Sequence, residues 1–202
     1  MKLWHCEHAR SLRPLWLLEE LDVPYELQVM AFPPRYKHKE FLTINVLGTV
    51  PYFEDGATRM TESSGICLYL INKYRRFDLG LETQHPEYGA YLNWLFQSDA
   101  TLTFPQTIYL RYTRLEPDER RSPQVADDYR RWYLGRLKML SDHLSQHDYL
   151  CENRFTIADI AVSYALYFGV ILKIHTEYPP QINDYLARTT ERPAFKRALS
   201  YQ

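Results

Sequence analysis

The sequence predicts an α/β domain built on a mixed four-stranded sheet, followed by an all-α domain. Strand-like and helix-like segments follow one another in the order β-α-β-α-β-β-α over residues 1–75. No convincing strand follows Glu87, and residues 76–86 are polar and aperiodic. We therefore expect one domain at residues 1–75, a linker at residues 76–86 and a helical domain at residues 87–202.

The first half opens with a strand, a helix and a second strand. Residues 2–6 and 25–30 have strand-like patterns. Between them, apolar residues recur at helical spacing: Leu12, Leu15, Trp16, Leu18 and Leu21. Pro14 stands in the first turn of that helix, where its missing N–H costs little, and Ser11 is a candidate N-cap. A strand–helix–strand unit requires a crossover, so the two strands are expected to be parallel.

The first half closes with a hairpin and a helix. A short helix is expected at about residues 37–44. Two extended segments, residues 52–54 and 58–60, flank Asp55-Gly56, and a D-G pair is a strong hairpin signal. A helix over residues 63–74 follows. The hairpin adds antiparallel strands to the parallel pair, so the predicted sheet is mixed.

The second half has helical patterns throughout. One stripe is formed by Tyr88, Tyr91, Leu92, Leu95 and Phe96, and Pro105 should kink or interrupt this helix. Further helices are expected at about residues 124–147, from about Thr156, and near Pro193.

A local signal marks the helix that begins near Thr156. Thr156 and Asp159 have the spacing of a capping box, and Phe155 and Ile160 occupy the positions of a hydrophobic staple. We interpret this segment as a folding element without chemistry of its own.

Composition and charge exclude several classes of function. The chain is 46% apolar and has a net charge of −1, whereas a nucleic-acid binder would show a basic excess. Its three cysteines form no C-x-x-C pair, so neither a disulfide framework nor a zinc site is expected. No apolar run approaches the ~20 residues of a membrane span. A cytoplasmic protein without a metal or membrane partner is therefore expected.

Four features carry a resemblance to a known family. They are the opening KLWHCEHARSLRPLWLLEEL, the segment NVLGTVPYFEDG, the pair Glu62-Ser63 in TESSGICLYL, and the C-terminal pieces FTIADIAV and ERPAFKRAL. In this order and spacing they resemble the glutathione S-transferase family, of the bacterial, cytosolic type, over nearly the whole chain. The resemblance implies a thioredoxin-like first domain, a homodimer, and glutathione as cosubstrate with no other cofactor.

The resemblance also implies residues that bind glutathione. The Val50–Pro51 bond would be cis, so that the main chain of Val50 pairs with the cysteinyl backbone of glutathione. Glu62 and Ser63, ahead of a helix N-terminus that attracts anions, would hold the γ-glutamyl ammonium and carboxylate. Arg35 would contact the glycyl carboxylate and Asp99 the ammonium. The alternatives are an ordinary turn proline, a simple helix cap and solvated loop charges.

The position that activates the thiol departs from the family pattern. Ala9 and Arg10 occupy the usual Ser and Cys positions, and Trp4 lies near the usual Tyr position. Lowering a thiol pKa by about 2 units needs about 2.7 kcal/mol, which one charge-assisted hydrogen bond of about 1.5–3 kcal/mol can supply. Arg10 and Ser11 are therefore the catalytic candidates. The alternatives are a solvated loop residue for Arg10 and a helix cap alone for Ser11.

A second chemistry remains open at the end of the first strand. Cys6 and His8 could form a nucleophile–base pair, although Cys6 is expected to point into the packing of the sheet. Neither residue belongs to a pattern with the paired spacing of a zinc site.

The predicted function is conjugation of reduced glutathione to hydrophobic electrophiles through a stabilised thiolate, as in detoxification. Phe104, Tyr109 and Tyr112 are candidates for the electrophile pocket, although an aromatic stripe is also typical of a helical core. Two alternatives stay open: a glutathione-dependent disulfide reductase or peroxidase, and a non-enzymatic binding protein with this fold. The sequence does not identify the electrophile.

Overall fold

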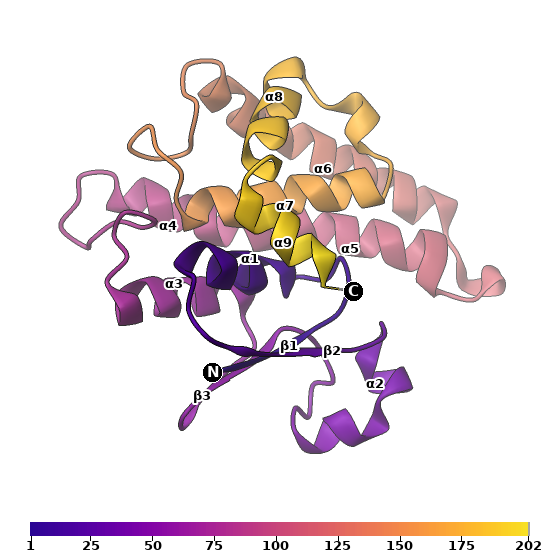
Figure 1. Cartoon of the computed structure of the whole chain (residues 1–202). Coiled ribbons are helices and arrows are strands. Elements are labelled where there is room, and N and C mark those ends of the chain that lie inside the picture. The colour runs from indigo at the N-terminus through magenta and orange to yellow at the C-terminus, as the bar shows by residue number, and fades with distance from the viewer. Residues whose placement is uncertain (202) are drawn as a thin grey trace. The chain divides into compact units, whose positions relative to one another are not determined.

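The computed structural model describes residues 1–201 and consists of two compact units (Figure 1). The first unit contains Met1–Gly80 together with the segment from Thr190, and the second contains Leu81–Thr189. The C-terminal segment, expected in the helical domain, is thus grouped with the first unit, because its helix packs there. The domain boundaries expected from the sequence stay a prediction.

A mixed four-stranded sheet forms the centre of the first unit. Its strands are β1 (Lys2–His5), β2 (Glu26–Val29), β3 (Tyr52–Asp55) and β4 (Thr58–Met60), in the order β2-β1-β3-β4. β1 runs parallel to β2 and antiparallel to β3, and β3 runs antiparallel to β4. This arrangement confirms the predicted sheet, including the hairpin at Asp55-Gly56.

Helices α1 (Leu12–Leu21) and α3 (Ser63–Tyr74) begin and end where the sequence predicts them. Every residue from Leu12 to Leu18 is buried, so α1 is enclosed on all sides. The single helix expected at residues 37–44 is instead two short ones, α2 (Pro34–Lys37) and η1 (Lys39–Thr43). The reason is local: Pro34 starts a helix early, and the non-helical backbone of His38 separates the two.

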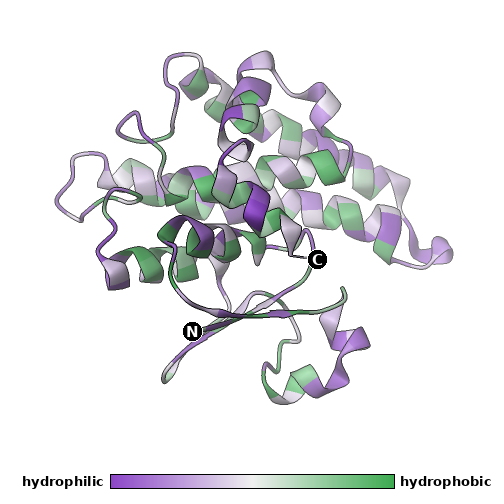
Figure 2. Ribbon diagram, in the orientation of Figure 1, coloured by the Kyte–Doolittle hydropathy of each residue, from purple (hydrophilic) through white to green (hydrophobic). Residues whose placement is uncertain are grey.

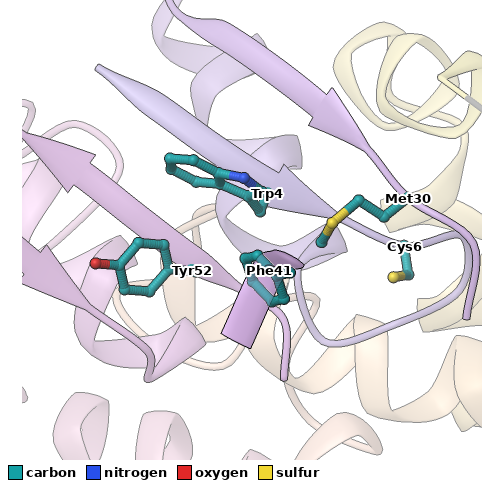
Figure 3. Close-up of a cluster of buried hydrophobic side chains, with 5 residues drawn as sticks. All are labelled: Trp4, Cys6, Met30, Phe41 and Tyr52. Atoms are coloured by element: carbon teal, nitrogen blue, oxygen red, sulfur yellow. The ribbon is translucent and has the colours of Figure 1, made fainter. Parts of the chain in front are cut away.

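One face of the sheet carries a cluster of buried side chains, shown in Figure 3: Trp4, Cys6, Met30, Phe41 and Tyr52. Trp4 and Cys6 share this face because side chains alternate along a strand. The rings of Trp4 and Tyr52 lie edge to face, with centroids 5.2 Å apart. Trp4 is therefore a core residue.

Helix α9 (Pro193–Ser200) packs against α1 within the first unit. The ring centroids of Trp16 and Phe195 are 4.7 Å apart. At the ends of this contact, Arg192 Nε donates to Glu20 at 2.6 Å, and Arg197 Nε donates to Glu19 at 2.7 Å. The C-terminal segment therefore completes the core of the unit that the first residues build.

The second unit is helical. Its elements are α4 (Tyr88–Gln97), η2 (Ser98–Thr103), α5 (Phe104–Leu110), η3 (Arg111–Leu115), η4 (Asp118–Arg120), α6 (Pro123–Leu144), α7 (Ile157–Ile171), η5 (His175–Glu177) and α8 (Pro180–Thr190). The chain winds as a wider π-helix through η2, directly before Pro105, which confirms the predicted interruption. Helix α8 was not predicted from the sequence, although its buried residues Ile182, Tyr185, Leu186 and Thr189 recur at helical spacing.

Helix α7 begins with the predicted capping box. Ala158 N donates to Thr156 Oγ1 at 3.2 Å, and Thr156 N donates to Asp159 Oδ2 at 2.8 Å. Hydrophobic residues recur along α7 (Figure 2). Most of them are buried. Despite this, no helix within residues 1–201 is both long and apolar enough to cross a membrane.

Candidate functional site

The topology brings three loop segments to one end of the sheet. Trp4 pairs with Tyr52 between β1 and β3, and Phe53 pairs with Met60 between β3 and β4. Extending both registers past the ends of the strands places opposite one another the pairs Cys6–Val50 and Pro51–Glu62. The loop at residues 7–11, the Val50–Pro51 segment and the start of α3 therefore share this end of the sheet.

The Val50–Pro51 peptide bond is cis, as the resemblance implies. Within residues 1–201, neither the N–H nor the carbonyl of Val50 forms a hydrogen bond. The side chains of Ala9 and Val50 both pack against the Trp4 cluster, so the two loops that carry them border the same core. Val50 thus offers a peptide ligand one unpaired donor and one unpaired acceptor, as an exposed strand edge does.

Asn45 shapes the loop that leads to Val50, and the sequence analysis missed it. Its Nδ2 donates to Thr49 O at 2.9 Å and its Oδ1 accepts from Leu47 N at 3.1 Å. It is only 4% exposed. The signal was present: an Asn three residues before Gly48, which has a φ of +57°, is typical of a tight turn.

Arg35 is held beside the same loop. A Cβ atom at Gly48 would lie 2.6 Å from the Cβ of Arg35, so only glycine permits this approach. The guanidinium of Arg35 is exposed and lies over the ring of Tyr36, 5.5 Å from its centroid. The structure therefore places Arg35 near Val50, with its charge open to solvent.

The N-terminus of α3 has open donors. Within the described part of the chain, the N–H groups of Ser63 and Gly65 form no hydrogen bond. Glu62 occupies the N-cap position and is exposed, but its side chain does not cap the helix. The alternative interpretation of Ser63 or Ser64 as a simple N-cap is therefore wrong. Unpaired N–H groups and the helix dipole together favour an anion at this end.

The Ser63 side chain accepts a hydrogen bond from Arg13, a residue that was not predicted as part of the site. Arg13 Nη1 donates to Ser63 Oγ at 3.0 Å. Arg13 is 0% exposed and Ser63 is 1% exposed. A charged residue within the apolar run of α1 was the available signal, because a buried arginine needs polar partners.

Ser11 has a structural role in the loop after β1. Ser11 occupies the N-cap position of α1, as expected, but its side chain forms no capping hydrogen bond. Instead, the Ser11 Oγ lies 2.8 Å from His5 Nδ1 and accepts from Cys6 N at 3.3 Å. Ser11 is 0% exposed, and its oxygen is already engaged by His5 and Cys6. Burial, with a smaller contribution from the charge of His8, lowers the pKa of His5 to about 4, so His5 is neutral at neutral pH.

The other residues at the end of β1 and in this loop differ in whether they could act on a thiol. Arg10 is half-buried, whereas Ala9 has no polar side chain to offer. Cys6 is 0% exposed, and burial raises the pKa of its thiol to about 12. A protonated, enclosed thiol is a poor nucleophile. The Nε2 of His8 pairs with the Glu7 carboxylate at 3.0 Å. These features argue against a Cys6–His8 pair and leave Arg10 as the candidate with an accessible side chain.

The remaining predicted residues belong to the second unit. Asp99 lies in η2 and is partly exposed, and Phe104, at the start of α5, is 47% exposed. Tyr109 and Tyr112 are half-buried, with the guanidinium of Arg111 lying 5.7 Å from the ring centroid of Tyr112. None of the three aromatic residues is a buried core residue. Their roles toward glutathione and the electrophile stay predictions.

Comparisons with known proteins agree with this architecture. A family model described as the glutathione S-transferase N-terminal domain matches residues 1–72, and one described as the C-terminal domain matches residues 105–193. Glutathione S-transferase 2 of Schizosaccharomyces pombe (strain 972 / ATCC 24843) is 30% identical over 166 residues, which cover 78% of this chain and 70% of that protein. Glutathione S-transferase 1 of the same organism is 29% identical over 216 residues, covering 96% and 93%.

Solved structures share the fold over the whole length. A bacterial glutathione S-transferase, BphK, superposes with a TM-score of 0.87 at 22% identity, covering 99% of this chain and 98% of that one. A sphingomonad glutathione S-transferase in complex with glutathione gives a TM-score of 0.85 at 23% identity, covering 99% and 98%. These define a protein with a thioredoxin-like domain and a helical domain. The chain belongs to the glutathione S-transferase family, whose members are transferase enzymes.

No metal site accompanies this arrangement in the described residues. Among residues 1–201 no group of three or more His, Cys, Asp or Glu side chains is placed to bind a metal ion.

Proposed function

We propose that the first unit binds reduced glutathione and that the protein conjugates it to hydrophobic electrophiles. The observation that carries the proposal is the meeting, at one end of the sheet, of the unpaired main chain of Val50 and the open N-terminus of α3. Val50 pairs with the cysteinyl backbone, Ser63 receives the γ-glutamyl carboxylate, and Glu62 meets the ammonium. The names of the fission-yeast relatives and the glutathione complex of the sphingomonad enzyme support this ligand.

In the conjugation reaction the protein positions the two substrates and stabilises the negative charge of the thiolate. The nucleophile is the thiol of glutathione, and the protein lowers its pKa by stabilising the thiolate. The Arg10 guanidinium and the N-terminal end of α1 both favour negative charge at the loop of residues 7–11. Because Ser11 is enclosed, its contribution is to hold this loop, and Arg10 makes the direct contact.

The proposal also includes contacts to the two ends of glutathione and to the electrophile. Arg35 pairs with the glycyl carboxylate, and Asp99 approaches the γ-glutamyl ammonium. Phe104, Tyr109 and Tyr112 line the pocket of the electrophile, because they are the aromatic side chains of α5 and η3 that are not fully buried.

A homodimer in the cytoplasm is part of the same proposal, in a detoxifying role. The second unit exposes three large apolar side chains on α4 and α6: Phe96 at 62%, Trp132 at 43% and Met139 at 48%. Gln97 Nε2 lies 3.4 Å from Met139 Sδ, so α4 and α6 meet at this point. An exposed apolar surface of this kind favours association with a second copy.

Calorimetry with reduced glutathione tests the binding site. Ser63→Ala should weaken binding by about 1–3 kcal/mol, or roughly 5- to 150-fold, because a hydrogen bond to a charged group is lost. Ser145→Ala is the matched control, since that exposed hydroxyl contacts the neighbouring Asp142 carbonyl and the Gln146 side chain and belongs to no part of the proposed site. Unchanged affinity in Ser63→Ala, or no binding by the unmodified protein at millimolar ligand, would contradict the site.

A non-enzymatic glutathione-binding protein is the second candidate, and two observations favour it: Ala9 lacks a polar side chain, and the Ser11 hydroxyl is enclosed. Turnover separates the candidates. Conjugation of a chloronitrobenzene supports the transferase, whereas faster turnover of a disulfide or a peroxide supports a reductase or peroxidase. Tight glutathione binding with no turnover of any of the three supports the binding protein.

A further inference from the structure

We propose that His38 is a positioning residue whose neutral ring holds the segment of residues 31–38, which carries Arg35. Protonation of this ring releases the segment and weakens the binding of glutathione. The inference rests on the proposed contact between Arg35 and the glycyl carboxylate, and it names the residue that makes this contact depend on pH. His38 touches no ligand; it acts through the main chain of Ala31.

The connection from β2 to α2 is held by one side chain. Residues 30–33 form this connection (Figure 1). Ala31 N donates to His38 Nε2 at 3.1 Å. Apart from bonds to the first turn of α2, this is the only hydrogen bond that residues 31–33 form within residues 1–201. Ala31 and Phe32 are also exposed, so packing contributes little to their position.

The bond fixes the protonation state of His38. An N–H group only donates, so Nε2 must offer its lone pair to Ala31. The hydrogen of the neutral ring is then on Nδ1, which lies 3.4 Å from Glu40 Oε1. A protonated ring has a hydrogen on each nitrogen. Nε2 and the N–H of Ala31 would then be two donors that face each other, so protonation breaks the bond.

The bond also ties the two ends of α2 together. This helix is a single turn of four residues, Pro34–Lys37, and a helix of that length is not stable alone. Ala31 lies before its start and His38 is its C-cap, so the bond spans the whole turn. Arg35 lies within the turn, and its guanidinium pairs with no acidic side chain in residues 1–201. When the turn opens, fewer molecules present Arg35 correctly, and the apparent affinity for glutathione falls by that fraction.

The charged residues near His38 belong to the two short helices, α2 and η1: Arg35, Lys37, Lys39 and Glu40. The end of β2 and its connection to α2, residues 27–33, contain no charged residue. Glu40 lies on the Nδ1 side of the ring, so it does not replace Ala31 as the partner of Nε2. Histidine ordinarily changes its charge between pH 5 and pH 8. The segment should therefore be closed at pH 8 and released as the pH falls towards 5.

Nuclear magnetic resonance of the isotope-labelled protein tests the bond without a ligand. A titration from pH 8 to pH 5 follows the ring nitrogens of His38 and the amide of Ala31. At pH 8 the Nε2 atom should carry no hydrogen, and the Ala31 amide signal should shift with the same midpoint as the ring. In His38→Gln the Ala31 signal should show no such midpoint, because the amide oxygen of glutamine accepts at both pH values.

Calorimetry with S-methylglutathione, whose sulfur cannot ionise, tests the effect on binding. The affinity of the unmodified protein should fall roughly 2- to 12-fold from pH 8 to pH 5, the effect of one ordinary hydrogen bond. His38→Gln keeps an acceptor for Ala31 that gains no proton, so it should bind at both pH values as the unmodified protein does at pH 8. His38→Ala has no acceptor and should bind with the weaker affinity at both.

Two controls separate this effect from other titrations. His147→Gln changes an exposed histidine of the second unit, whose ring contacts His143, and it should keep the full pH dependence. The glycyl amide of S-methylglutathione has no carboxylate for Arg35. Its affinity should be lower than that of the acid at pH 8 and should not follow the protonation of His38.

Each result supports or overturns the inference. A full pH dependence in His38→Gln would overturn it, and so would an Ala31 amide that does not follow the His38 ring. Equal pH dependence for the acid and the glycyl amide would overturn it too, because Arg35 would then not be the residue that the segment positions. A protein that binds neither ligand at pH 8 removes the proposed function and the effect on binding, while the Ala31 titration alone shows whether His38 holds the segment.

Discussion

Among single residues, His5 and Ser11 decide how the loop after β1 is held. Ser11 lies 2.8 Å from the His5 ring and also takes the N–H of Cys6, so it ties the end of β1 to the start of α1. Arg10 immediately precedes Ser11. A change in this buried pair should therefore reach catalysis through the position of Arg10.

Replacing the hydroxyl tests whether Ser11 is structural. Ser11→Ala should lower the free energy of unfolding by about 1–3 kcal/mol, because the buried N–H of Cys6 loses its partner. Urea denaturation measures this loss, and steady-state kinetics should show a reduced but measurable rate. Full stability combined with a complete loss of conjugation would show instead that the hydroxyl acts directly on the thiol.

The pH dependence of stability tests the state of His5. Its pKa is about 4 in the folded protein and 6.5 in the reference state, so below pH 6.5 the unfolded chain binds a proton that the folded chain does not. Stability should therefore fall as the pH drops from 6.5 towards 4, by up to about 3 kcal/mol. In His5→Asn this part of the slope should be missing, whereas the exposed His147→Asn should keep it. Equal slopes in all three proteins would rule out a neutral, buried His5.

Among the secondary-structure elements, α7 has a buried carboxylate, Asp159, at its start. Asp159 accepts from the N–H and hydroxyl of Thr156, from Leu150 N at 3.1 Å and from the Tyr185 hydroxyl at 2.9 Å. Asp159 of the capping box therefore also connects α7 to α8 through Tyr185 and to the preceding loop through Leu150. Burial raises the pKa of Asp159 to about 6, although these hydrogen bonds act in the opposite direction.

This carboxyl should give a pH dependence of the opposite sign to that of His5. Between pH 3.8 and about 6 the folded protein keeps a proton that the unfolded chain releases. Stability should therefore decrease as the pH rises through this window, by about 3 kcal/mol, and remain at the lower value above it. Asp159→Asn should be less stable overall and lack this decrease in urea denaturation curves recorded across the window. A decrease that persists in the variant would assign it to another group.

Helices with a signal in their own sequence could be predicted, whereas roles that depend on contacts formed only in the folded protein could not. α7 was predicted from a local signal, its capping box, and α3 begins and ends at the predicted residues. Arg13 and Asn45 were missed because their roles depend on partners brought near by folding or by a turn. Ser11 occupies the predicted N-cap position, but the contacts of its hydroxyl with His5 and Cys6 could not be predicted for the same reason.

Within the whole molecule, the first unit is built from both ends of the chain. Glu19 accepts from Arg197 at 2.7 Å and from Tyr25 at 2.5 Å, and Glu20 accepts from Arg192 at 2.6 Å. Burial would raise the pKa of Glu19, but the hydrogen bonds from Tyr25, Arg197 and Tyr201 outweigh it and lower the pKa. The Glu19 carboxylate therefore stays ionised at neutral pH as a partner for α9.

Removing the apolar side chain at the centre of the contact between α1 and α9 tests how much this contact contributes to the free energy of unfolding. Phe195 is 3% exposed and lies on Trp16, so Phe195→Ala should lower the free energy of unfolding by about 3–5 kcal/mol. Chemical denaturation measures the loss. Val46→Ala is the control, because Val46 is 86% exposed and should change stability by less than about 0.5 kcal/mol. An equal, small effect of both changes would mean that α9 is only loosely attached.

The return of α9 to α1 has a consequence for synthesis on the ribosome. Every strand of the sheet emerges before the second unit is made, and the segment from Thr190 emerges after it. Until then the nascent first unit has Trp16 without Phe195, and Glu19 and Glu20 without their arginines. The thioredoxin-like half therefore cannot mature as an early, independent folding unit, and a gene fragment that stops at Gly80 would encode an incomplete core.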